Sequence, residues 1–401
     1  MEPAMPPEPY EQHWQRNLAV CVFGAFTTIV AMTLLLPFLP LYVQSLGVND
    51  PAAIVQWSGV AFAATFFSAA LTAPLWGRLG DRYGRKLMLI RASLGMALAM
   101  SLIGLAQDVY QLVALRLLAG LLGGYASGST ILVATQTPKA RSAWALGVLA
   151  SGIMAGNLAG PLIGGLLPPL VGIRNTFFLA GAVIFVAFLA TALLLKESPR
   201  PKAEPGAKPA LRWAELEQRR PVLLMYAAAC LLMFATLSIE PIITVYLQVL
   251  NAEPVTLMAG LAMSATALGS ILSAPRLGKL ADRVGHWKVV AASLALAALC
   301  VLPQAWVQNG WQLIALRFAS GLALGGLLPC IAAILRHSVP SSVAGRVLGY
   351  STSAQYVGQV LGPLAGGYLG GHVGMRAVFV LTALLLALNA VLCRFGRPRM
   401  A

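Results

Sequence analysis

The sequence predicts an all-α polytopic membrane protein made of two six-helix bundles, and three observations support this fold class. First, 58% of the 401 residues are apolar and only 10% are charged, whereas a soluble domain has about 45–50% apolar and about 25% charged residues. Second, the chain carries twelve long apolar runs. Third, its second half repeats motifs of its first half.

The apolar runs are long enough to cross a bilayer, since a membrane helix needs about 20 mostly apolar residues. They lie at 17–46, 52–76, 87–106, 110–134, 142–168, 175–195, 221–249, 255–275, 289–307, 311–335, 346–370 and 376–393. After the sixth run, proline, alanine and charged residues replace the leucine-rich background. We therefore expect an N-terminal six-helix bundle at 1–195, a cytoplasmic linker without chemistry of its own at 196–220, and a C-terminal six-helix bundle at 221–401.

An internal repeat relates the two halves. The segment GRLGDRYGRK at 77–86 returns 201 residues later as GKLADRVGHWK at 278–288. The segment YQLVALRLLAGLLGG, which contains Arg116, is matched by WQLIALRFASGLALGG, which contains Arg317. Two homologous six-helix halves imply parallel repeats about an axis along the membrane normal, a pseudo-two-fold symmetry with a substrate cavity near the midplane. This architecture supports alternating access.

The formal net charge of +15 would suggest a nucleic-acid partner if the chain were soluble. The positions of the basic residues indicate a different origin. If the N-terminus is inside, 24 of the 28 Lys and Arg residues fall on cytoplasmic segments, and the positive-inside rule then places both termini in the cytoplasm. We therefore expect a multi-pass protein of the lipid bilayer that works as a monomer and binds no nucleic acid.

The five cysteines and four histidines are scattered singly, without the short spacings of a zinc site or a redox pair. The sequence also lacks HExxH, GxSxG and paired carboxylates within a span. We therefore expect no metal site and no enzymatic activity, and a membrane-embedded enzyme or receptor is disfavoured.

Several segments resemble one family of transporters. GRLGDRYGRK resembles the signature between the second and third helices of the major facilitator superfamily, and LVALRLLAG resembles the arginine signature of its fourth helix. PFLPLYVQSLGV and GRKLMLIRASLGMA are similar to bacterial multidrug efflux proteins of the twelve-helix drug:proton antiporter group. A further motif resembles the fifth-helix pattern of these antiporters and consists of Gly147, Gly156, Gly160, Pro161, Gly164 and Gly165.

The resemblance covers essentially the whole chain and implies a function. It implies a secondary active transporter of the bacterial inner membrane that exports structurally diverse drugs or amphiphiles by alternating access. The proton would be the coupling ion, and no other cofactor is implied. A narrow-specificity sugar or metabolite exporter of the same fold is the alternative, although the complete glycine pattern and the few polar residues in the spans count against it.

The first copy of the charged segment contains the residues of a gating latch. Asp81 lies close to Arg82 and Arg85 at the predicted cytoplasmic end of a helix, where a carboxylate can pair with an arginine and cap a neighbouring helix. Our hypothesis is that these residues hold the two halves together in the outward-facing state, with Gly77 and Gly84 allowing a tight turn. The alternative is a topology anchor, which needs arginine but neither the acid nor the glycines.

The second copy of this segment is altered. It keeps Asp282 and Arg283, but His286 and Trp287 stand where the first copy has Arg85. We therefore expect Asp282 and Arg283 to make a weaker version of the latch.

Three charged residues lie inside predicted spans. Arg116 and Arg317 occupy equivalent positions, and since a charge inside a span costs at least about 2.5–3.5 kcal/mol, each should face protein or water in a functional or a structural role. Glu240 is the acid that lies clearly inside a span, roughly 28 Å into the seventh at about 1.5 Å per residue, and it is the best candidate for the proton carrier. It could instead attract cationic drugs or bond a backbone group freed by Pro241.

Two further sets complete the candidate residues. Pro161 should bend the fifth helix, while its glycines should allow tight packing against the opposite half; packing alone accounts for the glycines but not for the proline.

Aromatic and amide side chains in the spans suit a broad apolar pocket with a few polar contacts, although most such aromatics form core or interface belts. The substrate-lining candidates are Phe26, Gln56, Asn157, Tyr226, Phe234, Gln355 and Tyr356.

Overall fold

The computed structural model describes residues 13–197 and 219–395, and within these ranges every regular element is a helix. The chain divides into two compact units. Unit 1 comprises Met1–Leu35 and Ser68–Gly206, and unit 2 comprises Leu36–Phe67 and Ala207–Ala401. The boundary crosses the long helix α3 (Pro51–Tyr83), so the two ends of α3 belong to different units. The division into bundles at the 196–220 linker stays a prediction.

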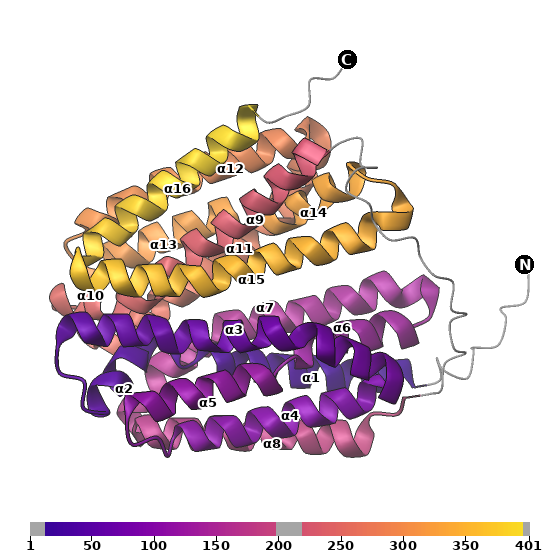
Figure 1. Ribbon diagram of the computed structural model, residues 1–401, viewed down its shortest axis with the longest axis horizontal. Helices are drawn as coiled ribbons and strands as arrows, with labels where there is room; N and C mark the ends of the chain where they lie inside the picture. Colours follow the sequence, from indigo (N-terminus) through magenta and orange to yellow (C-terminus); the bar gives the residue numbers. More distant parts are fainter. Residues whose placement is uncertain (1–12, 198–218, 396–401) are drawn as a thin grey trace, which may run out of the picture. The chain divides into compact units, whose positions relative to one another are not determined.

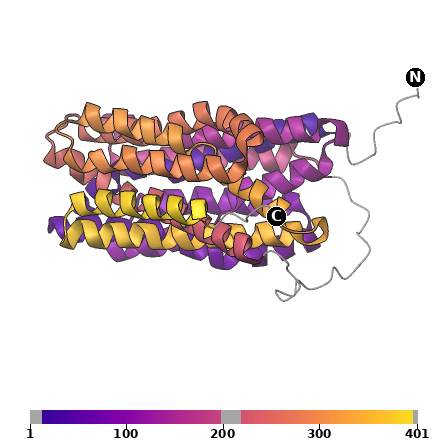
Figure 2. The same cartoon turned by 90° about the horizontal axis from the view of Figure 1, so that it is seen from above.

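Unit 1 contains α1 (Trp14–Thr33), the second part of α3 and five further helices. These are α4 (Arg85–Ile103), α5 (Val109–Leu122), α6 (Tyr125–Gln136), α7 (Lys139–Val171) and α8 (Ile173–Leu194). Within the unit α7 packs along α1 and α8 packs along α4. Figure 1 labels these helices, and Figure 2 shows from above that the long helices of a unit run in nearly the same direction. The core between them includes Cys21, Leu89, Tyr125, Leu132 and Leu195.

Unit 2 repeats this arrangement. Here α15 packs along α9, α16 along α12, and α13 along α11, as the labels of Figure 1 allow the reader to follow. Besides the first part of α3, unit 2 contains η2 (Leu36–Phe38), α2 (Leu39–Ser45), α9 (Arg219–Ile239), η4 (Glu240–Ile242), α10 (Ile243–Val249), α11 (Val255–Val284), α12 (His286–Val301), η5 (Leu302–Trp306), α13 (Gly310–Leu324), α14 (Leu327–His337), α15 (Ser341–His372) and α16 (Met375–Phe395).

Eleven helical segments among the described residues are long and apolar enough to cross a membrane. They coincide with eleven of the twelve predicted runs, and some combine a helix with its short continuation, as in Trp14–Ser45. The remaining run, 346–370, lies in α15, which at 32 residues is longer than a span requires but contains many glycine, serine and glutamine residues. The predicted all-helical, twelve-helix architecture is confirmed.

The charged segment between the second and third spans is almost wholly helical, whereas the sequence led us to expect a loop. Gly77 and Asp81 lie inside α3, and Gly84 alone separates α3 from α4. Gly84 has a φ of +94°, a left-handed conformation that glycine adopts without strain. The expected turn is therefore correct for Gly84 and wrong for Gly77. In unit 2, α11 and α12 meet in the same way at Gly285, where φ is +98°.

Three glycines of the α7 motif, Gly156, Gly160 and Gly164, pack against α1 and its C-terminal end in the same unit, so the expected packing against the opposite half is wrong for these three. A Cβ atom added at Gly160 would overlap Oγ1 of Thr33, and one added at Gly164 would overlap the carbonyl oxygen of Leu34. Gly366 of α15 meets the backbone of α9 equally closely in unit 2. Glycine is required at these positions because two helix backbones approach each other directly.

Replacing Gly164 by alanine should destabilise the protein by about 1–3 kcal/mol, since the added Cβ would force α7 away from α1. Gly147→Ala is the matched control on the same helix, because a Cβ at Gly147 has nothing within 4 Å and alanine is the better helix former. The melting temperature of the detergent-purified protein should fall for G164A and hold or rise for G147A. Equal melting temperatures would show that the close approach is unimportant.

Candidate functional site

Arg317 and Glu240, which the sequence predicted as separate charges inside spans, form one ion pair in unit 2. Nη2 of Arg317, on α13, lies 2.6 Å from Oε1 of Glu240, the first residue of η4. The side chains are 4% and 13% exposed, respectively. Burying both charges has a large desolvation cost, which their mutual attraction offsets. Removing one partner of such a pair typically destabilises a protein by about 3–5 kcal/mol.

The pair leaves two of its polar atoms unsatisfied. Among the described residues neither Oε2 of Glu240 nor Nε of Arg317 has a hydrogen-bond partner. A buried polar atom without a partner costs about 1–3 kcal/mol. The carboxylate thus has one oxygen engaged by Arg317 and one buried without a partner among the described residues.

The backbone around Glu240 explains its position. Pro241 has no N–H group and cannot continue the α-helical hydrogen bonds, so α9 ends at Ile239 and a 3₁₀ turn follows. The first repeat breaks in the same manner at Pro37, where η2 begins with Leu36. Because Leu36 occupies the position equivalent to Glu240, the first repeat cannot form the same ion pair.

Arg116, the equivalent of Arg317, lies on α5 inside unit 1 with 1% of its surface exposed. The side chain therefore faces protein, as a charge within a span requires. Close to it, Oγ of Ser68 on α3 donates to the backbone carbonyl of Leu117 at 2.7 Å, which joins α3 to the arginine helix.

The fourth span is broken between α5 and α6, and two side chains satisfy the freed carbonyl groups. Gly124 has a φ of +104° at this break. Nε1 of Trp76 donates to the carbonyl of Leu121 at 2.8 Å, and Nη2 of Arg91 donates to the carbonyl of Gly123 at 3.0 Å. The guanidinium of Arg91 also lies 3.6 Å from the centre of the Trp76 ring, a cation–π contact. This role of Arg91 was not apparent from the sequence.

The ion pairs of the predicted latch residues form within each copy of the charged segment. Arg85 forms an ion pair with Asp81 across Gly84, and Asp81 is 73% exposed. In the second copy Asp282 pairs with Nε2 of His286 at 3.5 Å. The part of Arg283 in a weaker latch stays a prediction. The imidazole of His286 completes a full ion pair only when it is protonated. An exposed pair of this kind contributes only about 0.3–0.5 kcal/mol by itself.

Glu197, at the start of the linker, caps the first turn of α4. Its Oε1 accepts the backbone N–H of Arg85 at 2.8 Å, and its Oε2 accepts that of Lys86 at 2.7 Å. Two predictions are thereby corrected: the linker was assigned no chemistry, and Asp81 was expected to be the cap. A carboxylate at a helix N-terminus satisfies free N–H groups and complements the helix dipole.

The segment that carries Glu197 is itself fixed to unit 1. Leu195 is fully buried in the core. Oδ1 of Asn17 on α1 accepts the N–H of Lys196 at 3.0 Å, and Nδ2 of Asn17 donates to the carbonyl of Lys196 at 2.7 Å. These two hydrogen bonds to the backbone of one residue hold Glu197 beside Gly84. An acid directly after the sixth span was the only signal in the sequence that could have indicated the cap.

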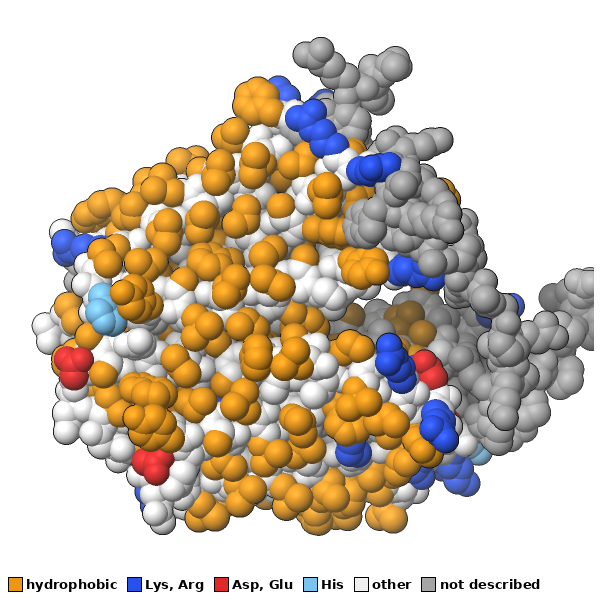
Figure 3. Space-filling view, viewed as in Figure 1, with side chains coloured by type: hydrophobic (Ala, Val, Ile, Leu, Met, Phe, Trp, Pro, Cys, Tyr) orange, Lys and Arg blue, Asp and Glu red, His pale blue; other side chains and the backbone are white. Residues whose placement is uncertain are grey.

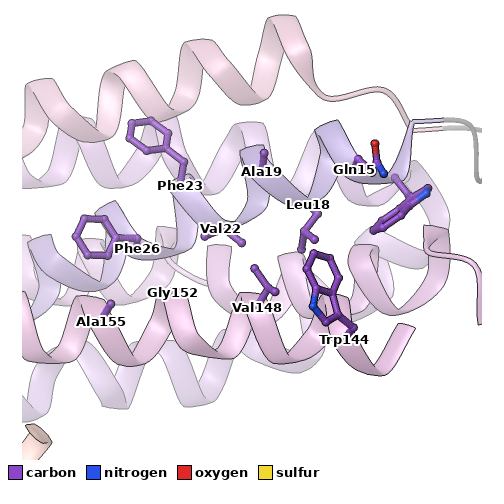
Figure 4. Close-up of a pocket in the computed structure, with 11 residues that line it drawn as sticks. Gln15, Leu18, Ala19, Val22, Phe23, Phe26, Trp144, Val148, Gly152 and Ala155 are labelled. Carbon is purple, nitrogen blue, oxygen red and sulfur yellow. The ribbon is translucent and has the colours of Figure 1, made fainter. Parts of the chain in front are cut away.

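An apolar cavity of about 760 Å³ lies between α1 and α7 of unit 1. Figure 4 shows Val22 of α1 facing Val148 of α7, with Phe26 further along α1 and Trp144 on α7. The ring of Trp144 packs edge-on against Trp14 at 6.3 Å. Gln15 provides the only amide or charged side chain of the lining. The cavity is in the size range of drug-binding sites and is mostly apolar, as such sites are.

Of the seven substrate-lining candidates, the cavity contains Phe26 and none of the other six. The hydroxyl of Tyr226 donates to the carbonyl of Val347 at 3.0 Å and thereby joins α9 to α15. Nδ2 of Asn157 donates to the carbonyl of Ile153 on its own helix at 3.2 Å. The role of Gln56, Phe234, Gln355 and Tyr356 in substrate binding stays a prediction.

The sequence matches the family model described as the Major Facilitator Superfamily over residues 21–260 and 255–401. It is 42% identical over 382 residues to the multidrug resistance protein MdtG of Enterobacter lignolyticus, and the alignment covers 94% of this chain and 91% of that protein. MdtG of Salmonella arizonae is 41% identical over 393 residues and 96% of both chains. MdtG of Serratia proteamaculans is 42% identical over 390 residues, 96% of this chain and 95% of that protein.

Two solved structures of a bacterial homologue of the human lysosomal transporter Spinster have a similar fold. The inward-facing, unoccupied form gives a TM-score of 0.77 at 15% identity and covers 98% of both chains. The inward-facing, occupied form gives a TM-score of 0.75 at 16% identity and covers 98% of this chain and 97% of that chain. At these identities the likeness concerns the fold alone.

Replacing Glu197 by alanine should weaken the start of α4, because two backbone N–H groups lose their acceptor. Loss of a helix cap costs about 0.5–2 kcal/mol. Hydrogen exchange at Arg85 and Lys86 should become faster, while exchange in the middle of α4 stays slow. Lys196→Gln is the matched control, since the bonds of residue 196 to Asn17 use its backbone. Equal exchange rates in E197A and the parent protein would contradict the assignment.

Proposed function

Because the chain belongs to the Major Facilitator Superfamily, we propose that it exports structurally diverse drugs or amphiphiles from the cytoplasm in exchange for protons. It is a multi-pass membrane transporter rather than an enzyme, and the proposal places it in the bacterial inner membrane. The observation that carries the proposal is the identity of 41–42% to MdtG multidrug resistance proteins over more than nine-tenths of each chain.

The cavity of unit 1 supports a broad, apolar substrate class. Its lining from α1 and α7 offers aromatic and aliphatic surface with Gln15 as the only amide, so it can accept ligands of different shapes through burial of apolar area. A sugar would need many convergent hydrogen-bond partners, which this lining does not supply. The proposal therefore favours amphiphiles over the alternative of a narrow sugar or metabolite exporter.

Proton coupling in this proposal uses the Glu240–Arg317 pair. In the ionised state, Oε1 of Glu240 accepts from Arg317. A proton from the outer side adds to the open Oε2, which removes the negative charge and frees the guanidinium to move. Release of that proton to the cytoplasm restores the carboxylate and the pair. The two protonation states thus have different preferred packings, which is what coupling a proton to alternating access requires.

The gating part of the proposal uses the latch, its second copy and helix α7. The latch consists of Asp81, Arg82, Arg85 and Gly84, with Asp282 and His286 as its second copy. The exposed pair of Asp81 and Arg85 contributes too little free energy to hold one conformation by itself. A latch therefore needs further contacts in the outward-facing state. The glycine helix α7, which contains Pro161, would be the segment that moves. Both termini would face the cytoplasm.

The proposed activity can be tested with everted membrane vesicles that have an acidic interior. Addition of several structurally unrelated drugs should cause protons to leave the interior, which a pH-sensitive dye reports. Proton release with one narrow class of solute, such as a sugar, would support the alternative. No release with any solute, in vesicles shown to hold folded protein, would refute coupled transport.

Neutralising the buried carboxylate should abolish drug-dependent proton release. E240Q leaves Arg317 as an uncompensated buried charge, so E240Q/R317Q is included because it removes both charges. Drug binding should persist in the double variant. The control is E253Q, which changes an exposed acid of the same unit. Full proton release by folded E240Q/R317Q would eliminate this pair as the coupling site.

Asp81→Asn should slow drug export severalfold without lowering the melting temperature. The pair with Arg85 adds little to stability because Asp81 is 73% exposed, so a transport defect in a stable protein would indicate a role in gating. D50N is the control: Asp50 is another exposed acid, it accepts the backbone N–H of Ala53 at a helix start at 2.9 Å, and asparagine can keep this cap. Normal export by well-inserted D81N would leave only a topology anchor.

A further inference from the structure

A second groove lies between α12 and α16 in unit 2, with a volume of about 470 Å³. Its floor is made of small side chains, Ala291, Ala292 and Ala295 on α12 with Ala390 on α16. Two basic side chains, Lys288 and Arg394, and two aromatic ones, Trp287 and Phe395, also line it. No acidic residue is part of the lining. The groove is therefore apolar along its length and cationic at one end.

The two cations are available to a ligand. Lys288 and Arg394 are exposed, and within residues 13–197 and 219–395 neither side chain makes an ion pair or hydrogen bond. Lys288 is the third residue of α12 and Arg394 the next-to-last residue of α16. Figure 3 shows Lys and Arg side chains gathered around the end of α16, next to a broad hydrophobic face. Each basic side chain near an anionic membrane surface contributes about 1 kcal/mol of attraction.

The repeat indicates that an anion belongs beside the first turn of α12. The equivalent helix of unit 1, α4, has the carboxylate of Glu197 on its first turn. Both helices start after a glycine with similar φ, +94° at Gly84 and +98° at Gly285. The described lining of the groove includes no carboxylate that could take this part. In unit 2 the same region carries Lys288 and Arg394 instead.

The apolar part of the groove continues along the outer faces of its two helices. Leu296 and Leu299 on α12 are exposed, as are Leu384, Leu388 and Val391 on α16. In a chain that spans the membrane, exposed leucines along a span face lipid tails. Trp287 at the cationic end suits the headgroup level, where aromatic side chains gather.

We propose that the groove between α12 and α16 binds one anionic phospholipid of the cytoplasmic leaflet. The phosphate group contacts Lys288 and Arg394, and an acyl chain lies on the alanine floor. A zwitterionic lipid of the same chain length binds less well, since its headgroup carries no net charge. This inference concerns a lipid ligand and does not depend on which solute the protein transports.

Native mass spectrometry of the full-length protein tests the site. The protein is incubated in detergent with phosphatidylglycerol or with phosphatidylcholine of the same acyl chains, and the lipid retained per protein is measured. Phosphatidylglycerol should be retained in preference, and K288Q/R394Q should bind it about thirtyfold more weakly, which is about 2 kcal/mol at 1.4 kcal/mol per tenfold. The matched control is K139Q/R141Q, which removes two cations at the start of α7 and should bind as the parent does.

Two further measurements keep the proposal open to refutation. Ala295→Trp fills the floor without changing charge, so it should also reduce phosphatidylglycerol retention if an acyl chain lies there. Excess inorganic phosphate should not displace the lipid from the parent protein. Equal retention by folded K288Q/R394Q and the parent, unchanged retention by A295W, or displacement by inorganic phosphate would each overturn the assignment of a phospholipid site.

Discussion

The cost of burying charge and unsatisfied backbone polar groups in an apolar environment governs this structure. Arg317 lies inside a span and forms its ion pair with Glu240. Arg91 lies against the ring of Trp76 and the carbonyl of Gly123. Where a charge cannot reach water, a partner must lie within hydrogen-bond reach. The few charged residues of the spans therefore mark the points at which helices are held together.

The same cost explains what happens where helices are interrupted. The break between α5 and α6 exposes carbonyl groups, and the side chains of Trp76 and Arg91 satisfy them. The start of α4 exposes N–H groups, and Glu197 accepts two of them. Since lipid offers no hydrogen bonds, an interruption near the membrane persists only if protein groups complete it. These contacts position the arginine helix and the start of α4.

The two repeats share their backbone packing but differ in their charges. In both, a glycine face brings two helices together, α7 with α1 and α15 with α9. The charged residues have diverged: Glu240 corresponds to Leu36, and His286 corresponds to Arg85. Backbone packing tolerates little change because a single added methyl group overlaps the neighbouring helix. Charged positions can change once the fold is established. As a result, one half carries the buried ion pair of Glu240 and Arg317 and the other half carries the helix cap by Glu197.

The sequence by itself determined the spans, the duplication, the family resemblance and the candidate charges Arg116, Arg317 and Glu240. Hydropathy and motif spacing are properties of short stretches of chain, so they can be read without knowing what packs against what. Only the tertiary structure decided the partners. Glu240 and Arg317 are 77 residues apart in the chain, and Glu197 and Arg85 are 112 apart. Such pairs depend on which helix faces meet and at what depth, and for that reason the cap by Glu197 and the packing of α7 on α1 could not be predicted from the pattern along the chain.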